Sequence, residues 1–499
     1  MPADGVTEAG PGKPPVLGSG SDTDDNTPTM VAYTPAPESR EFRDKEKDPE
    51  KNSLPDVEAD ADGDGDGDAR AATIEGVAPS DGAAPPPPPS TVSEAPDGGW
   101  EAWSVVFGAW CTSFCSFGWI NSVGIFQNYY ENGPLKDYSA STISWIPSLQ
   151  IFFMMGMGPI IGRLFDAYGP RHVLFCGTIL AVFGLMMASL STQYYQFLLA
   201  QGVCSAIGVS GVFQPALSCI PGWFTKHRGA AFGILSTGSS LGGVIFPIMV
   251  SRLIERVGYG WAMRASAFLI LGLLVCANLT VRSRLHANGA RAPPLTRAQM
   301  QQPFHEVGFV LLLLGLFFLT FGIFAPINYI PVQALATGSV DFSLSQYLVS
   351  IFNACSLVGR LLSGWLADRI GKFNTFMLSG YMSGILVLAL WIPGKSQPAL
   401  IAFSSLFGFA SGAYVSLLAS LVAQVSPHKE MGYRTGLVFL VGSIPGLITS
   451  PIAGAILGDF AHGNWVGVQV FAGVLLLVGS SIVLMSRIKY TGFKLVTVF

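Results

Sequence analysis

The stretch GRLFDAYGPR at residues 162–171 returns in altered form as GWLADRIGK at residues 364–372. The first copy's Gly162, Leu164, Asp166 and Gly169 match Gly364, Leu366, Asp368 and Gly371 at a constant offset of 202. A second match, at an offset of 204, pairs Gly238, Ser239, Gly242 and Pro247 with Gly442, Ser443, Gly446 and Pro451. Helix ends at a membrane surface explain one such loop, but not two matches at nearly one offset. The chain therefore contains a duplicated unit.

The composition around this repeat is that of a membrane protein. Half of the 499 residues are hydrophobic and 12% are charged, against about 25% charged residues in soluble domains. About twenty apolar residues cross a bilayer as a helix, and the chain after Trp100 contains twelve such runs. The runs cover residues 103–128, 141–165, 171–190, 195–222, 229–251, 261–281, 305–331, 343–367, 374–392, 398–424, 435–457 and 465–486.

Charge is distributed unevenly along the chain. Residues 1–100 hold 22 of the 32 acidic residues and 7 of the 28 Lys and Arg, so this segment has a net charge near −15 and the rest near +11. Its first 96 residues are rich in Pro, Gly, Asp and Ala, which is typical of a disordered segment. If this tail is cytosolic, the inner loops and the C-terminal end carry fifteen Lys and Arg and the outer loops four. This asymmetry predicts that both ends of the chain lie in the cytosol.

The predicted fold class is an all-α integral membrane protein with twelve transmembrane helices in two six-helix pseudo-repeats. Two parallel halves related by an axis along the membrane normal place a substrate site between them, near the midplane. The expected parts are an acidic cytosolic tail 1–96, a first bundle 97–281, a basic, loop-like connector 282–304, a second bundle 305–486 and a short cytosolic tail 487–499.

This organisation and the loop at 162–171 resemble the major facilitator superfamily. The pattern Gly-x-x-x-Asp-x-x-Gly-x-Arg is similar to that family's motif between the second and third helices. The resemblance implies that Asp166, with Arg163 and Arg171 as basic partners, holds helix ends together in one access state and releases them in the other. The gating residues that it implies in the two copies are Gly162, Arg163, Asp166, Gly169, Arg171, Gly364, Asp368, Arg369 and Gly371.

Two further stretches narrow the resemblance to the monocarboxylate transporter family. PDGGWEAW at 96–103 is similar to one motif of that family, with one residue more between the tryptophans than the animal version has. WFTKHRGAAFGILSTGSSLGG at 223–243 is similar to a second motif, with an aromatic pair, basic residues and a glycine ladder. The long acidic tail and short C-terminus resemble the fungal branch of the family. Glycines one turn apart in this ladder allow a neighbouring helix to approach closely.

Two charged side chains lie well inside the predicted hydrocarbon, Arg264 and Arg360. An arginine there costs roughly 2.5–3.5 kcal/mol on insertion scales. Arg264 is near the outer end of its span, where its side chain can reach the interface. Arg360 falls at the position of the arginine that binds substrate carboxylate in the monocarboxylate family. The alternative for Arg360 is a structural role, bridging to backbone carbonyls or to the cluster around Asp368.

The chain departs from that family at two positions. Asn121 and Ser356 stand where proton-coupled members carry a lysine and an acidic residue, and no Asp or Glu lies in the middle of a predicted span. Proton symport of lactate-like acids is therefore not favoured, whereas binding of an anionic or polar organic molecule is. A neutral, aromatic-rich cavity is expected around Trp119, Phe213 and Tyr329. The candidate substrate residues are Asn121, Gln214, Asn353, Ser356 and Arg360.

These residues predict a secondary active or facilitative transporter that moves a small organic solute, a monocarboxylate or related organic anion, by alternating access. The alternatives are an exporter of a fungal secondary metabolite, a carrier of a riboflavin-like vitamin and, from another class, a non-transporting nutrient sensor. The expected partners are the lipid bilayer, the solute and a coupling proton or other ion, but no nucleic acid. We expect no enzyme activity, cofactor or metal, because the sequence has no nucleophile–base pair, metal cluster or phosphate loop. The expected location is the plasma membrane, with the vacuolar membrane as the alternative.

Overall fold

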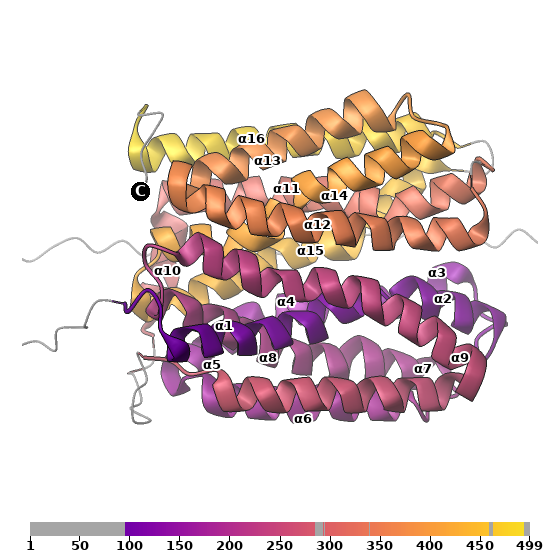
Figure 1. Ribbon diagram of the computed structural model, residues 1–499, viewed down its shortest axis with the longest axis horizontal. Helices are drawn as coiled ribbons and strands as arrows, with labels where there is room; N and C mark the ends of the chain where they lie inside the picture. The colour runs from indigo at the N-terminus through magenta and orange to yellow at the C-terminus, as the bar shows by residue number, and fades with distance from the viewer. Residues whose placement is uncertain (1–94, 285–292, 294, 339, 459–462, 494–499) are drawn as a thin grey trace, which may run out of the picture. The chain divides into compact units, whose positions relative to one another are not determined.

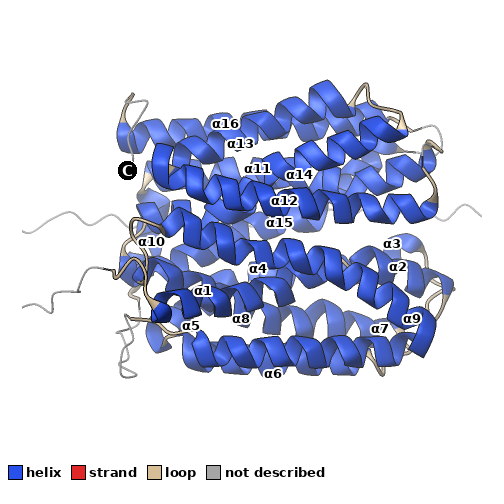
Figure 2. Cartoon of the chain, viewed as in Figure 1, coloured by secondary structure: helices blue, strands red, loops and turns tan. Residues whose placement is uncertain are grey.

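A computed structural model describes residues 95–284, 293, 295–338, 340–458 and 463–493. This part of the chain is helical throughout and contains no strand (Figure 2). The predicted acidic tail lies outside the described residues, apart from positions 95 and 96.

The first half of the chain forms nine α-helices with short 3-10 and π-helical pieces between them. The helices are α1 Trp100–Ser113, α2 Val123–Asn132, α3 Ala140–Ile143, α4 Trp145–Gly156, α5 Gly158–Tyr168, α6 Pro170–Ala188, α7 Tyr194–Phe197, α8 Ala206–Cys219 and α9 Arg228–Thr280. The π-helical pieces are η1 Phe114–Gly118 and η2 Leu198–Ser205, and η3 Ile220–Gly222 is a 3-10 turn.

The second half is built from fewer and longer helices. They are α10 Arg297–His305, α11 Val307–Ala336, α12 Phe342–Ile370, α13 Lys372–Leu386, α14 Gln397–Val425, α15 Met431–Leu457 and α16 Trp465–Thr491. The π-helical piece η5 Val387–Trp391 continues α13, and the 3-10 turn η6 His428–Glu430 precedes α15.

Helix lies over every one of the twelve predicted spans. Among the described residues, ten helical stretches are long and apolar enough to cross a membrane. One of them, α9, contains two predicted spans, and the first predicted span is divided among α1, η1 and α2. Exposed apolar side chains follow helical spacing, as with Phe175, Ile179 and Phe183 on α6, which is typical of a helix face turned to lipid.

The structure corrects the prediction in three places. The loop expected between the spans 229–251 and 261–281 is absent: two helices, which share the label α9, meet at a kink at Gly258, where φ is 78°. The connector 282–304, expected to be loop-like, leads into α10, which begins after the capping pair Thr296 and Gln299. The final helix α16 continues to Thr491, into the expected C-terminal tail.

The helices run side by side along one direction, with α1 to α9 in one group and α11 to α16 in the other (Figure 1). We call the side at which α1 begins and α16 ends the termini side. Several pairs of elements join the groups: α12 packs along α9, α15 packs along α4 and α5, and α14 and α8 contact α9 and α15, respectively. The contacts of α12 with α9 and of α15 with α4 and α5 are called the α9–α12 seam and the α5–α15 seam.

Candidate functional site

The α5–α15 seam is closed on the termini side by a carboxylate. The two oxygens of Asp166, near the end of α5, accept hydrogen bonds from the backbone N–H groups of Gly432 at 2.9 Å and Tyr433 at 2.8 Å. These amides belong to the first turn of α15, where N–H groups have no helical partner and the helix dipole is positive. These two hydrogen bonds from the first turn of α15 therefore hold the two halves together on the termini side.

The α9–α12 seam repeats this arrangement with the roles of the halves exchanged. Asp368, near the end of α12, accepts hydrogen bonds from the N–H groups of Gly229 at 2.7 Å and Ala230 at 2.8 Å. Both amides belong to the first turn of α9. The sequence repeat thus becomes two equivalent latches, each formed by an aspartate from one half and a helix N-terminus from the other.

Glycines let the backbones meet directly beneath each latch. A Cβ atom on Gly162 would lie 2.1 Å from the carbonyl oxygen of Gly432, and one on Gly364 would lie 2.5 Å from that of Gly229. No side chain fits at such distances without moving a backbone. The termini side of both seams is therefore sealed in this conformation.

The predicted gating glycines after the latches act as turns. Gly169 has a φ of 75° and Gly371 a φ of 96°, values at which other residues are strained. Each glycine immediately precedes the next helix, α6 or α13. These turns let the chain reverse within one residue of the aspartate-bearing helix.

The first turn of α15 is fixed by a buried ionic cluster that the sequence analysis missed. The side chain of Arg434 is fully buried and forms a bidentate pair with Glu306, at 2.6 Å to each oxygen, and a further pair with Glu430 at 2.9 Å. Glu306 precedes α11, and Glu430 precedes α15. Arg434 was counted as an inner-loop cation, and only its helical distance of four from Glu430 could have indicated the pair.

The loop that leads into α9 is fixed by the aspartate of the PDGGWEAW stretch. The Oδ1 atom of Asp97 accepts hydrogen bonds from the N–H groups of Thr225 at 2.6 Å, Lys226 at 2.7 Å and His227 at 3.4 Å. Partial burial opposes ionisation of this carboxyl, but the three amides outweigh it and hold its pKa below the ordinary value. The segment before α1 is thereby attached to the loop that begins α9.

Arg360 lies in the α9–α12 seam, one helical turn further from the termini side than Gly364. Its Nη1 group donates to the carbonyl oxygen of Ser236 at 2.5 Å and to the hydroxyl of Ser239, both on α9. Its Nε group donates to Ser356 on its own helix at 3.2 Å. The side chain is 5% exposed, and no described carboxylate lies within ion-pair distance of it. Arg360 thus bridges to a backbone carbonyl rather than to Asp368.

Further from the termini side, a hydrogen bond across this seam joins two amide side chains. Asn353 on α12 donates to the side-chain oxygen of Asn121 at 3.0 Å. Asn121 stands in the gap between η1 and α2, and its own amide donates to the carbonyl of Phe117. A Cβ on Gly243 would lie 2.8 Å from the Asn353 amide, so α9 supports the pair. Two of the five predicted substrate residues, Asn121 and Asn353, therefore contact each other between the halves, while Ser356 contacts Arg360 nearer the termini side.

Comparison with known proteins places this arrangement in a family. The model of the Major Facilitator Superfamily matches residues 102–372 and 312–491. The chain belongs to the Major Facilitator Superfamily. It is a multi-pass membrane transporter of that superfamily. The predicted narrower likeness to monocarboxylate transporters stays a prediction.

The relatives of this facilitator include named fungal proteins. It is 58% identical over 401 residues to the MFS transporter asaE of Aspergillus flavus, covering 80% of this chain and 90% of the relative. It is 56% identical over 404 residues to the fujikurins efflux protein of Gibberella fujikuroi, covering 81% and 86%. Its fold is similar to that of the fucose:proton symporter of E. coli, with a TM-score of 0.59 and 15% identity, covering 76% of this chain and 98% of the symporter.

The remaining predicted residues of the facilitator lie away from the seams or turn outward. Gln214 on α8 is buried and donates to Ser210 of the same helix at 3.2 Å. The side chains of Arg163, Arg171 and Arg369 are exposed, and the guanidinium of Arg369 stacks 3.9 Å from the ring centroid of Trp365. Arg264 donates to Ser189 at 3.2 Å, at the end of α6, which agrees with a structural role.

Of the three residues expected around an aromatic cavity, one contacts the other half. Phe213 on α8 contacts Phe439 on α15 across the halves, with ring centroids 5.6 Å apart. Trp119 packs instead against Phe246, 5.2 Å away within the first half, and the hydroxyl of Tyr329 donates to the carbonyl of Ser450 within the second half. Both rings are 7% exposed or less and serve the cores of their own halves.

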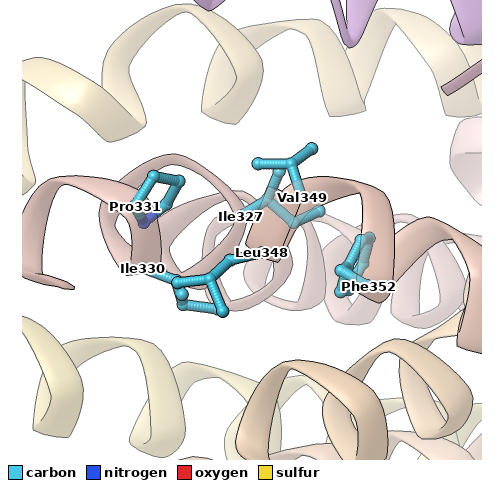
Figure 3. Close-up of a pocket in the computed structure, with 6 residues that line it drawn as sticks. All are labelled: Ile327, Ile330, Pro331, Leu348, Val349 and Phe352. Atoms are coloured by element: carbon cyan, nitrogen blue, oxygen red, sulfur yellow. The ribbon is translucent and has the colours of Figure 1, made fainter. Parts of the chain in front are cut away.

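An apolar pocket lies between α11 and α12, on the part of these helices that is further from the termini side. Its lining faces inward from both helices (Figure 3). Asn353 follows the pocket residue Phe352 directly and donates to the carbonyl of Val349, another pocket residue. The neutral amide pair and this apolar surface are therefore neighbours. The six lining residues are Ile327, Ile330, Pro331, Leu348, Val349 and Phe352.

Proposed function

We propose that this facilitator exports a fungal secondary metabolite that carries an acidic oxygen, such as a carboxylate, phenolate or enolate. The observation that carries the proposal is the buried, carboxylate-free guanidinium of Arg360 between the halves. A buried cation without a counter-ion favours an anionic ligand because burial strengthens the attraction between opposite charges. Efflux is supported by the similarity to the fujikurins efflux protein of Gibberella fujikuroi.

The termini side is assigned to the cytosol in this proposal, because Lys and Arg gather in the loops on that side. With both latches joined, the conformation described here is closed to the cytosol. Export then requires the seams to part, a ligand to enter from the cytosol, and the latches to form again behind it. We place the protein in the plasma membrane, where this direction removes a product from the cell; the vacuolar membrane would store it instead.

The polar residues of the α9–α12 seam favour a molecule with neutral hydrogen-bonding groups beside its acidic oxygen. Asn121, Asn353 and Ser356 offer such groups, and a small apolar pocket lies further along α12, between α11 and α12. A ligand with one acidic oxygen, several neutral polar groups and an apolar body matches this set. Neither Asn121 nor Ser356 can carry a proton, so a coupling proton would have to bind elsewhere.

The PDGGWEAW stretch favours a second candidate, transport of a small monocarboxylate. The Asp97 contacts give that stretch a structural place beside α9. The two candidates differ in substrate size and direction, and one flux measurement separates them. We would reconstitute the full chain in sealed proteoliposomes and compare radiolabelled lactate, radiolabelled benzoate and a fujikurin.

The proposal expects saturable flux of the larger anions, little flux of lactate, and a loss of at least tenfold in Arg360→Gln. Arg264→Gln, the other intramembrane arginine, serves as the matched control and should retain flux because its contact with Ser189 lies within one half. Equal flux in Arg360→Gln and the parent would refute the assigned contact. Saturable binding without flux of any solute would favour the nutrient sensor.

A further inference from the structure

We propose that α9 supplies displacing ligands for the transported anion: the hydroxyl of Ser239 and the carbonyl of Ser236 occupy Arg360 when the termini side closes. This inference rests on the proposed function, because it takes Arg360 as the contact for the acidic oxygen. It adds a step that the latches alone do not provide, the removal of the bound anion from its arginine.

The three groups meet only across the seam. Arg360 is on α12, whereas both of its acceptors from the first half are on α9. The Ser239 hydroxyl also donates to the Ser236 carbonyl at 3.0 Å. This hydrogen bond directs the lone pairs of the Ser239 oxygen toward the arginine. The acceptors are therefore held in place before the arginine arrives.

The opening of the termini side has to separate these groups. Asp368, Gly364 and Arg360 follow one another at four-residue intervals on α12, so they lie on one face of the helix. Gly364 contacts the backbones of Gly229 and Gly233, at a level between the latch and Arg360. When the latch parts and α9 moves away, the guanidinium loses its two acceptors on α9 before the deeper Asn121–Asn353 pair has to part.

A buried guanidinium needs oxygen acceptors in each state, because an unpaired buried charge is costly. In the open state a carboxylate or phenolate of the ligand can supply them, and a charged oxygen is a stronger acceptor than a hydroxyl or a carbonyl. Closure must therefore replace a strong acceptor by two weaker ones. The two aspartate latches form in the same movement and stabilise the closed state in which the anion has been displaced.

This exchange distinguishes ligands by the charge of one oxygen atom, the one that reaches Arg360. A compound whose acidic oxygen reaches Arg360 competes with Ser239, and its bond to the arginine breaks on closure. An ester of the same compound lacks the charge, so it neither competes strongly nor is displaced. The structure thus assigns Ser239 a positioning role in the release of the anion from Arg360, not in its binding.

The test compares Ser239→Ala with two matched variants of the full-length protein in lipid nanodiscs. Ser266→Ala is the control because Ser266 is a buried serine of α9 whose hydroxyl donates to the carbonyl of Ala262 in its own helix. Ser239→Thr keeps a hydroxyl and should restore parental behaviour. The probes are radiolabelled benzoate and its neutral methyl ester, and the readouts are equilibrium affinity and dissociation rate.

We expect Ser239→Ala to bind benzoate about tenfold more tightly and to release it more slowly, since a hydrogen bond to a charged group no longer favours closure. Methyl benzoate binding should not change in any variant. Parental benzoate affinity in Ser239→Ala, with binding abolished in Arg360→Gln, would overturn the displacement and leave the proposed contact intact. If the parent does not bind benzoate, or Arg360→Gln binds it normally, the proposed contact and the displacement are both refuted.

Discussion

Both seams of this transporter close with an aspartate on a helix N-terminus. They differ eight residues before that aspartate, about two helical turns further from the termini side. The offset of 202 that relates Asp166 to Asp368 also relates Gly158 to Arg360. At Gly158 a Cβ atom would lie 2.3 Å from the carbonyl oxygen of Gly436, so backbone meets backbone. At Arg360 a long charged side chain reaches between the halves. One duplicated latch is therefore purely mechanical, while the other also contains the group that we assign to the ligand.

The same asymmetry extends to the supports of the latches. The first turn of α15 is held by the side chain of Arg434 between two glutamates. The loop that leads into α9 is held by a single carboxylate, Asp97, which accepts hydrogen bonds from backbone amides. Removing a buried ion pair and removing a surface cap differ several-fold in free energy, which ranks the following predictions.

The largest effect is expected from Arg434→Met. The substitution leaves Glu430 buried without its cation and should lower the free energy of unfolding by about 3–5 kcal/mol. Thermal unfolding in detergent measures the effect. Arg252→Met is the control, because the pair of Arg252 with Glu255 is exposed and such pairs contribute about 0–1 kcal/mol. Equal unfolding temperatures of the two variants would show that α15 does not depend on the cluster.

A side chain in the mechanical seam should prevent closure without unfolding the halves. Gly162→Leu places a Cβ where the carbonyl of Gly432 lies, and overpacking of this kind costs about 1–3 kcal/mol. We expect the distance between spin labels on the termini ends of α5 and α15 to increase and flux to fall. The control is Gly272→Leu, since no atom lies within 4 Å of a Cβ at Gly272. An unchanged label distance in Gly162→Leu would contradict a sealed seam.

Neutralising the latches one at a time compares the seams directly. Asp166→Asn and Asp368→Asn each remove a charge from a helix N-terminus, with an expected shift of about 1 kcal/mol toward the open conformation. Spin-label distances across both seams report the shift. Asp368→Asn should in addition increase benzoate affinity, because it frees Arg360 from α9, whereas Asp166→Asn should do so less. An equal change of benzoate affinity in the two variants would contradict the proposed difference between the seams.

The smallest effect concerns the support of α9 and depends on pH. The pKa of Asp97 is lowered in the folded protein, so its contribution is present above the unfolded pKa of 3.8 and is lost as the pH falls through the folded value. Protection of the 225–227 amides from hydrogen exchange should therefore persist down to about pH 4 and decrease below it. Asp97→Asn should weaken that protection at neutral pH. Equal protection in Asp97→Asn and the parent at pH 7 would argue against the cap.

Much of the fold could be predicted from the sequence because hydrocarbon imposes simple rules. A span needs a long apolar run, and the repeated Gly and Asp residues at 162–169 and 364–371 located two equivalent helix ends. The kink at Gly258 could not be predicted, because one residue with positive φ can replace a loop. The preceding Arg252 and Arg256 are as typical of a loop as of a helix. The capping residues Thr296 and Gln299 could have predicted the start of α10.

The candidate site was predicted less completely, for a different reason. Asn121, Asn353 and Arg360 are predicted because polar groups in a span need a function or a partner, and each of them has a partner from the other half. Their partners could not be predicted, since Ser236 contributes a backbone carbonyl, which every residue carries. The amides that bind Asp166 were missed on the same ground. Contacts to backbone leave no trace in residue identity, and they form most of both latches.

The kink at Gly258, where the two helices of α9 meet, has a mechanical consequence. Gly229 lies 29 residues before Gly258, which at about 1.5 Å per residue is a lever of about 44 Å pivoting on one glycine. A tilt of about 5° at that pivot carries the far end sideways by about 4 Å, more than the length of a hydrogen bond. A small rotation at the membrane face opposite the termini is thus sufficient to disengage Asp368. A ligand that restricts rotation at Gly258 would therefore slow the opening of the Asp368 latch.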